Sequence, residues 1–358
     1  AGLLLKGLAD RREAARQEAL HILGGLFASK ALGYGDKTSL FTLIGKKLLF
    51  LIGEQTEEEL TFFYTAASLS HVYRFIVLHK IQSGPFQFEI PEKAAFFPGT
   101  FDPFSLSHKG IVQAIRNLGF EVYLAVDEFS WSKKAQPSLI RRQIVSMSVA
   151  DEFDVYLFPH DIPVNLATPA DLDRLRQVFA GQALYLAVGS DVVAGASSYR
   201  APPAPGSVHF LNHIVFRRSS DAEGREIDAD LSCLRGDVLQ LQLPTHLEDI
   251  SSTRIRENID LGRDISNLIE PSVQDYIYRN SLYLREPQYK QVVRAGFLDF
   301  ERIPHPDAAL WEELRAMAAA ERRPLPEPDP RDGVLVLRHT RSGERIVGFL
   351  TLRTVSDR

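Results

Sequence analysis

Hydrophobic and polar residues follow a helical spacing in the first part of the chain. Apolar side chains recur broadly every three or four positions, with charged residues between them. This spacing places the apolar side chains on one face of an amphipathic helix. Three stretches share the pattern: residues 8–31, 38–52 and 57–82. The pair Gly84-Pro85 interrupts it, because both residues disfavour a continuing helix. We therefore expect a helical region over residues 1–90.

A different pattern begins at residue 94, where short apolar runs alternate with helical stretches. The runs typical of buried strands are AAFFPG from residue 94, EVYLAV (121–126), DVYLFP (154–159), ALYLAVG (183–189), part of HFLNHIVFRR (209–218) and VLQLQL (238–243). Helical patterns over residues 108–118, 138–150 and from Thr168-Pro169 to about 180 lie between them. Such alternation favours a parallel sheet covered on both faces, with ligands at the carboxyl ends of the strands. We therefore expect an α/β domain over residues 91–285.

The last part of the chain, residues 286–358, has a third character. RRPLPEPDPRDG at residues 322–333 holds four prolines among charges, which is typical of a linker or long loop. Residues 333–355 then form two apolar runs around a Ser-Gly turn, a pattern that predicts a β-hairpin. We expect a short α/β tail here.

Composition narrows the classes of protein that this chain can represent. Apolar residues make up 45% of the 358 residues and charged residues 24%, as in a globular protein. The net charge of −5 gives no electrostatic footprint for nucleic acid. The single cysteine, Cys233, excludes a disulfide framework and a multi-cysteine metal site, so we expect a reduced, cytoplasmic setting. No apolar run reaches the ~18 residues that span a bilayer, and we expect no membrane partner.

The stretch FPGTFDPFSLSHKG at residues 97–110 combines a glycine-led turn with the expected start of a helix. Gly99 lets the backbone approach a ligand closely, because it has no Cβ. The free N–H groups of the turn and of the helix N-terminus attract anions such as phosphate. His108 would lie at the mouth of this helix, where a neutral imidazole can donate a hydrogen bond to a phosphate oxygen. The alternative is a plain strand–turn–helix connection with Asp102-Pro103 as turn chemistry.

A second stretch, ISSTRIR at residues 250–256, also has the character of an anion site. Ser251, Ser252 and Thr253 lie just before a helical pattern, where they can cap the helix and offer hydroxyls to a phosphate. Arg256 follows Thr253 by three residues and returns to the same helix face. Arginine matches phosphate geometry with two parallel donors. The alternative is an ordinary N-cap followed by solvated arginines.

Together the two stretches resemble the two signatures of the HxGH nucleotidyltransferase superfamily, GxFDPxHxGH after the first strand and ISSTxIR at a late helix. LAVGSD (186–191) is similar to the family's strand-end Gly-x-Asp segment. Residues 250–283 resemble, nearly position by position, the C-terminal stretch of bacterial nicotinate-mononucleotide adenylyltransferases. The resemblance covers roughly residues 94–284 and implies a Rossmann-like nucleotidyltransferase fold.

The resemblance implies a reaction in which the 5′-phosphate of a mononucleotide attacks the α-phosphorus of ATP and pyrophosphate leaves. Its partners would be ATP and a mononucleotide, with Mg²⁺ carried on the triphosphate by ATP and water rather than by a protein metal site. The protein would position the reactants and stabilise charge on the phosphates, with His108 contacting them. The residues implied in nucleotide binding are Gly99, Thr100, Phe101, Asp102, Lys133, Lys134, Gly189, Asp191, Ser251, Ser252, Thr253 and Arg256.

Some of these residues have plainer interpretations. Lys133 and Lys134, like Arg141 and Arg142 on the next expected helix, could form solvated faces. Asp191 could be a helix cap. Tyr199 falls near the place where the family often has an aromatic residue against the pyridine ring, and it could equally be an ordinary loop aromatic.

The first motif departs from the family pattern at two positions. Ser105 stands in place of the first histidine and Ser107 in place of the glycine. A serine hydroxyl is short and brings no positive charge, and losing one such donor typically costs ~10²–10³ in rate. In one interpretation Lys109, Lys133 or Lys134 replaces the lost histidine, and Ser105, Lys109 and His108 make up the catalytic group. In the other, the domain binds a nucleotide but has lost its chemistry.

Other classes of function stay open at this point. Pantetheine-phosphate adenylyltransferases and cytidylyltransferases share the first motif and use other phosphate acceptors. The helical region could dock a partner, a second copy of the chain or fused partner domains. GERIVGFLTLR, within residues 333–355, resembles an early strand pair of the GNAT acetyltransferase fold, but no glycine-rich acetyl-CoA loop follows it.

Overall fold

The computed structural model describes residues 1–53, 59–126, 135–160, 162, 164–217, 231–248, 250–284, 298–320, 325, 332–339 and 345–353. The chain divides into two compact units, Ala1–Tyr289 and Lys290–Arg358. The first unit holds both the helical region, residues 1–90, and the α/β domain, residues 91–285. None of the described helices is long and apolar enough to cross a membrane.

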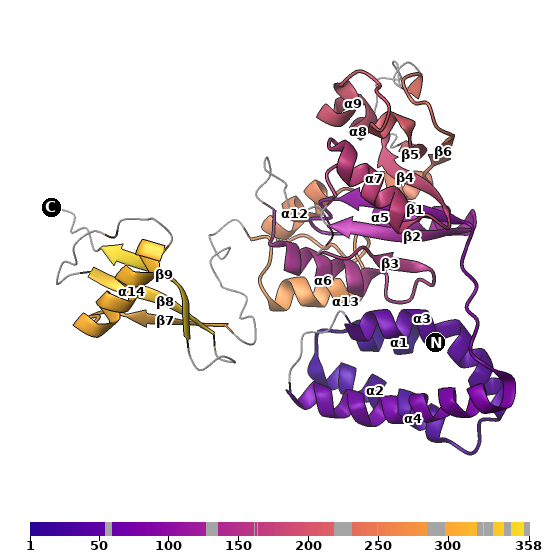
Figure 1. Ribbon diagram of the computed structural model, residues 1–358, viewed down its shortest axis with the longest axis horizontal. Helices are drawn as coiled ribbons and strands as arrows, with labels where there is room; N and C mark the ends of the chain where they lie inside the picture. The colour runs from indigo at the N-terminus through magenta and orange to yellow at the C-terminus, as the bar shows by residue number, and fades with distance from the viewer. Residues whose placement is uncertain are drawn as a thin grey trace. The chain divides into compact units, whose positions relative to one another are not determined.

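The helical region holds α1 (Gly2–Ala9), α2 (Glu13–Ala28), α3 (Tyr34–Gly53) and α4 (Glu59–Ser83) (Figure 1). The pattern at residues 8–31 predicted one helix, but the structure has a break between α1 and α2. Asp10 is extended, and its carboxylate accepts the Arg12 N–H at 2.8 Å. A side-chain bond of this kind offers the backbone an alternative to the helix. At the other end, Gly84 has a φ of +85°, so the predicted stop after α4 is confirmed.

The α/β domain contains a six-stranded sheet. Its strands are β1 (Lys93–Gly99), β2 (Phe120–Val126), β3 (Val155–Leu157), β4 (Ala183–Gly189), β5 (Asn212–Arg217) and β6 (Val238–Gln242). They lie in the order β3-β2-β1-β4-β5-β6, and every pairing is parallel. The predicted Rossmann-like α/β fold is therefore confirmed. The order reverses between β1 and β4, so their carboxyl ends form the switch point.

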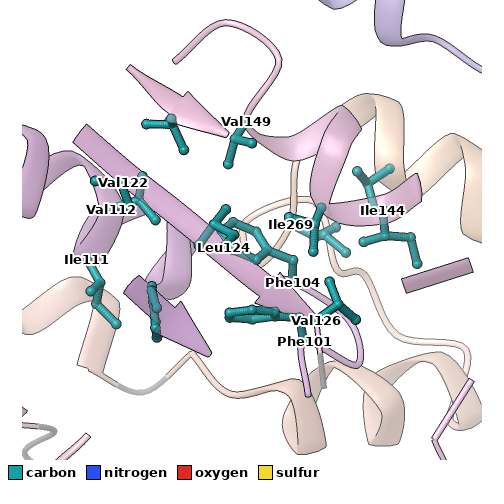
Figure 2. Packing of buried hydrophobic residues seen from close by; sticks show 14 of the residues in the cluster. Phe101, Phe104, Ile111, Val112, Val122, Leu124, Val126, Ile144, Val149 and Ile269 are labelled. Carbon is teal, nitrogen blue, oxygen red and sulfur yellow. The ribbon is translucent and has the colours of Figure 1, made fainter. Parts of the chain in front are cut away.

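Helices cover both faces of this sheet (Figure 1). They are α5 (Leu106–Asn117), α6 (Ser138–Ser148), α7 (Pro169–Val178), α8 (Ser190–Gly195), α9 (Ser197–Arg200), the 3₁₀ turn η1 (Val208–Phe210), α11 (Thr245–Glu248), α12 (Ser252–Asp260) and α13 (Pro271–Arg279). Phe97 of β1 joins the hydrophobic cluster with α5, α6, α12 and α13, whereas Phe96 joins the cluster with α7 and α8. Neighbouring strand residues point to opposite faces, which is why the strands are apolar throughout. Figure 2 shows part of the first cluster, in which Phe101 and Phe104 join Leu124 of β2.

The helical region packs against β3, the edge strand of the sheet. The Phe50 ring of α3 meets the Tyr156 ring of β3 with centroids 5.5 Å apart. Nζ of Lys47 donates to the backbone carbonyl of Val155 in the same strand. An edge strand has unpaired backbone groups. The helical region therefore covers this edge of the sheet.

The second unit contains β7 (Leu298–Ile303), α14 (Ala308–Ala320), β8 (Asp332–His339) and β9 (Arg345–Arg353). The three strands form an antiparallel sheet in the order β7-β8-β9, so the predicted hairpin at residues 333–355 is confirmed. Trp311 and Leu314 of α14 pack on Val334 and Val336 of β8. The resemblance of this hairpin to a GNAT fold stays a prediction.

Candidate functional site

A cavity of about 540 Å³ opens at the carboxyl ends of β1 and β4, at the switch point of the sheet. Such a position is where open parallel sheets bind ligands. Its lining consists of Phe97, Pro98, Gly99, Thr100, Phe101, Asp102, His108, Leu166, Val188, Gly189, Asp191, Val192, Phe216, Ser251, Ser252, Thr253 and Arg256. Both sequence motifs and the Gly-x-Asp segment after β4 therefore meet at one cavity.

The turn after β1 is built around close packing of Gly99 and Phe101. A Cβ on Gly99 would lie 2.7 Å from the Phe101 ring, closer than any side chain tolerates. Phe101 has a positive φ of 47° and is only 3% exposed. Its ring meets the His108 ring edge to face, with centroids 5.3 Å apart. A residue with a Cβ at position 99 would therefore clash with the Phe101 ring, and the same ring packs against the ring of His108.

His108 is oriented by the N-cap of its own helix. Ser105 caps α5: its hydroxyl accepts the His108 N–H at 3.3 Å, and its own N–H donates to Nδ1 of His108 at 3.0 Å. Since a backbone N–H can only donate, Nδ1 is an acceptor, and in the neutral ring the proton lies on Nε2. The ring lines the cavity with its orientation and tautomer set by this capping box.

Ser105 and Ser107, the two departures from the family motif, do not line the cavity. The Ser105 hydroxyl lies 2.9 Å from Nδ1 of His108, so the hydroxyl contacts the histidine ring. Ser107 is fully buried, and its hydroxyl has no hydrogen-bond partner within the described parts of the chain. Ser105 therefore acts on the site through His108.

Three side chains bind the backbone carbonyls of the turn after β1. Arg141 of α6 donates to the carbonyl of Thr100 at 2.6 Å. Arg256 donates to the carbonyl of Asp102, and Ser252 donates to the carbonyl of Pro103 at 2.9 Å. The last two contacts join the second motif directly to the first.

Asp102 lies where the second motif contacts the first. It is 5% exposed, and its carboxylate accepts the Gln136 N–H at 3.1 Å and lies 3.8 Å from the Arg256 guanidinium. Burial raises the pKa of the Asp102 carboxyl above its usual range, while the Gln136 N–H and the nearby guanidiniums of Arg256 and Arg141 act in the opposite direction.

The second motif forms the N-terminus of α12. Ser251 is the N-cap, and its hydroxyl accepts the Arg254 N–H at 3.2 Å. Nη2 of Arg256 donates to the hydroxyl of Thr253 at 3.2 Å, one helical turn away. The cavity therefore lies between the N-termini of α5 and α12, with the Arg256 guanidinium at its wall. Helix N-termini and arginine both favour a bound phosphate.

The wall at the end of β4 has a different character. A Cβ on Gly189 would lie 2.2 Å from the Asp191 carboxylate, so the glycine makes room for that side chain. Val188, Val192 and Phe216 line the cavity beside Asp191. The sequence motifs assigned no role to these apolar residues, although Val188 lies within LAVGSD, because they look like ordinary core positions. Their place at strand ends was the signal that could have found Val188 and Phe216.

Other predicted site residues are not brought to the cavity. Nζ of Lys109 lies 2.6 Å from Glu270 and 3.0 Å from Asp151, so its side chain points into an acidic cluster. The expectation that Lys109 replaces the missing histidine is wrong, because an ammonium held there does not reach the cavity. Lys133 and Lys134 lie outside the described residues.

Tyr199 is a core residue rather than a cavity aromatic. It is 6% exposed, and its hydroxyl lies 3.0 Å from Nε2 of His213. Burial lowers the pKa of His213 to about 4, which keeps that imidazole neutral. The suggestion of an aromatic contact to a pyridine ring therefore does not apply to Tyr199.

Part of the chain matches a known protein family. Residues 96–258 match the family model described as cytidylyltransferase-like. This match supports the resemblance to the nucleotidyltransferase superfamily that the two sequence motifs indicated.

The chain is also similar to nicotinate-nucleotide adenylyltransferases. A probable enzyme of that name from Caldicellulosiruptor bescii is 25% identical over 201 residues, covering 54% of this chain and 100% of that protein. Another from Chromobacterium violaceum is 26% identical over 224 residues, covering 53% and 98%. The solved structure of Plasmodium falciparum nicotinic acid mononucleotide adenylyltransferase complexed with NaAD is 18% identical, with a TM-score of 0.45 over 54% of this chain and 97% of that chain.

Proposed function

We propose that this protein transfers the adenylyl group of ATP to the 5′-phosphate of nicotinate mononucleotide and releases pyrophosphate. The observation that carries the proposal is the direct contact of the two motifs at one cavity, where Arg256 and Ser252 bind the turn that leads to His108. The names of the relatives supply the acceptor, because nicotinate-nucleotide adenylyltransferases cover the same half of the chain.

In this proposal the triphosphate lies between the N-termini of α5 and α12. Their orphan N–H groups and helix dipoles favour the negative charge. Arg256 binds the β- and γ-phosphates with N–H groups beyond those that hold the turn, since a guanidinium has five. Thr253 adds a hydroxyl hydrogen, since its oxygen accepts from Arg256, whereas the hydroxyl of Ser252 is already donated to the Pro103 carbonyl and helps to place the turn. These contacts hold the leaving pyrophosphate in place.

The transfer itself asks for alignment rather than covalent chemistry from the protein. An oxygen of the acceptor phosphate attacks the α-phosphorus of ATP. The bond from that phosphorus to the bridging oxygen breaks, and its electrons leave with pyrophosphate. Nε2–H of His108 donates to an oxygen of the α-phosphoryl group, where negative charge develops. A preorganised donor of this kind contributes ~10²–10³ in rate.

The cavity also has groups that fit Mg²⁺ carried on the triphosphate. This ion prefers oxygen ligands and keeps several of its waters. Among the described residues, Asp102 and Asp191 are the carboxylates on the wall, and Asp102 is engaged by the Gln136 N–H. Asp191 is therefore the residue that would accept hydrogen bonds from metal-bound water. When bound, the ion neutralises charge on the phosphates.

A second candidate function is nucleotide binding without transfer. It is favoured by one observation: Ser105, in the place of the family's first histidine, has its hydroxyl against Nδ1 of His108 and does not line the cavity. The site then has one imidazole donor where the family has two. Loss of a single donor typically costs ~10²–10³ in rate.

The test is pyrophosphate release by the full chain with ATP and Mg²⁺. Nicotinate mononucleotide, nicotinamide mononucleotide and phosphopantetheine serve as parallel acceptors. We expect release with nicotinate mononucleotide, a fall of about 10²–10³ in His108→Ala, and wild-type release in His160→Ala, whose histidine is exposed and outside the cavity. Release with another acceptor only would correct the substrate. No release with any acceptor, together with thermal stabilisation by ATP, would establish the second candidate.

A further inference from the structure

A short turn of the α/β domain packs against the helical region. The turn at residues 149–154, which we call the docking turn, connects α6 to β3. Ala150 is fully buried in the hydrophobic cluster of the helical region, and Phe153 packs against that cluster. Val149 of the same turn is buried in the cluster of the α/β domain, so the docking turn is part of both cores.

Two lysines and two carboxylates form a closed ring of ion pairs at this turn. Nζ of Lys109, on α5, lies 3.0 Å from Asp151 of the docking turn and 2.6 Å from Glu270, the N-cap of α13. Nζ of Lys6, on α1, lies 3.1 Å from the same aspartate and 3.3 Å from the same glutamate. Each carboxylate thus bridges one lysine of the helical region and one lysine of α5.

Helix α5 is held to these segments along its whole length. Gln113 and Arg116 both bind Glu152 of the docking turn at 2.6 Å. At the start of the helix, the Leu106 N–H donates to the carbonyl of Leu268 at 3.0 Å, two residues before Glu270. The position of α5 therefore depends on the docking turn on one side and on the segment before α13 on the other.

We propose that the helical region positions the catalytic histidine, and that Lys6 is the positioning residue that does so. The proposal rests on the proposed function, because it assigns Lys6 a role in that reaction. Lys6 acts on α5 through Asp151 and Glu270, which also hold Lys109, the neighbour of His108. Without the Lys6 ammonium, Asp151 and Glu270 share Lys109, whose Nζ also lies 3.6 Å from Glu152 of the docking turn. The mutual repulsion of these carboxylates then separates the docking turn from the start of α13.

Electrostatics at Asp151 agree with this geometry. Burial alone raises the pKa of its carboxyl, but hydrogen bonds and charge from Lys109 and Lys6 outweigh burial and hold the pKa below its usual range. Asp151 is therefore ionised at neutral pH and needs its cations. A displacement of about 1 Å in a group that orients a substrate costs up to about 10²-fold in rate.

The experiment compares three variants of the full chain. Lys6→Met removes the ammonium, Lys6→Arg restores a cation, and Lys46→Met is the matched control. Lys46 also joins the helical region to the docking turn, at Asp154 (3.0 Å) and at Glu121 of β2 (3.4 Å), but it does not contact the ring that holds Lys109. We measure kcat, KM for ATP, and the ¹⁵N chemical shifts of the His108 ring without substrate.

We expect Lys6→Met to lower kcat about 10-fold or more, to leave KM for ATP within twofold, and to shift the His108 ring signals. Lys6→Arg restores kcat and the signals, and Lys46→Met changes neither. Unchanged kcat and ring signals in Lys6→Met, or equal losses in both Met variants, would overturn the proposal. If the wild-type protein transfers no adenylyl group, the proposed function fails, and the ring signals alone decide whether Lys6 positions His108.

Discussion

Lys47 of α3 is an almost fully buried ionisable residue, and its replacement tests how the helical region packs against the sheet. The side chain is 1% exposed, and Nζ lies 5.5 Å from the Tyr156 ring besides donating to Val155. Burial lowers the pKa of Lys47 to about 7, and nearby carboxylates, Glu152 first among them, offset this only in part. Lys47→Met keeps an unbranched apolar side chain as far as Cε and removes the amine.

The magnitude follows from the drop in pKa from 10.5 to about 7, which amounts to about 5 kcal/mol for the charged amine. The unfolded chain keeps its proton up to about pH 10.5, whereas the folded protein releases it above about pH 7, so this cost to stability falls as pH rises between the two. The cost to stability has nearly its full value at pH 6 and is about 2 kcal/mol at pH 9. Lys47→Met removes this cost and leaves the Val155 carbonyl without its donor, about 1–3 kcal/mol at either pH.

We therefore expect the stability of Lys47→Met relative to wild type to decline by about 3 kcal/mol between pH 6 and pH 9. Urea denaturation of both proteins, followed by far-ultraviolet circular dichroism, measures this difference. Lys46→Met is the control, because Lys46 is paired with two carboxylates at a partly exposed site. A difference between Lys47→Met and wild type that is the same at both pH values would show that the Lys47 amine does not titrate in this range.

Three further predictions concern the site and its support. Asp151→Asn should lose less stability in acid than wild type does. The pKa of Asp151 lies below its usual range, so its contribution to stability is present above about pH 4 and is lost as pH falls through the folded pKa. Urea midpoints between pH 5 and pH 2 that match those of wild type would contradict this. Gly99→Ala should destabilise the protein by about 1–3 kcal/mol and weaken ATP binding, because the new Cβ meets the Phe101 ring. Thermal melts with and without ATP measure both effects, and unchanged values would show that the turn can accommodate a Cβ. Ser105→Ala should cost about 0.5–2 kcal/mol through the lost cap and shift the His108 ring signals in nuclear magnetic resonance spectra; unshifted signals would show that the cap does not orient the ring.

Much of the fold followed from local patterns, because parallel strands buried on both faces are continuous apolar runs. β4 was predicted at its observed bounds, Ala183–Gly189. The break between α1 and α2 was not predicted, since it depends on a side-chain bond from Asp10 that leaves the hydrophobic spacing unchanged. Periodicity reports which face is buried, and it is insensitive to a short interruption of this kind.

The candidate site was predictable where residues act from a motif, and unpredictable where they act across the fold. Gly99, His108 and Arg256 line the cavity as expected. Lys109 was misplaced because consecutive helix residues point about 100° apart, so the neighbour of a cavity histidine faces elsewhere. The contact of Lys6 with Glu270 spans 264 positions in the chain, so a local sequence pattern does not predict it.

The affinity of Arg256→Ala for ATP shows whether the two motifs form one nucleotide site. Isothermal titration calorimetry with Mg²⁺-ATP compares it with wild type and with Arg254→Ala, an exposed arginine on the same helix that does not line the cavity. We predict measurable binding by wild type and Arg254→Ala and none by Arg256→Ala, because a bidentate phosphate contact is lost. Equal affinity in all three proteins would contradict the account.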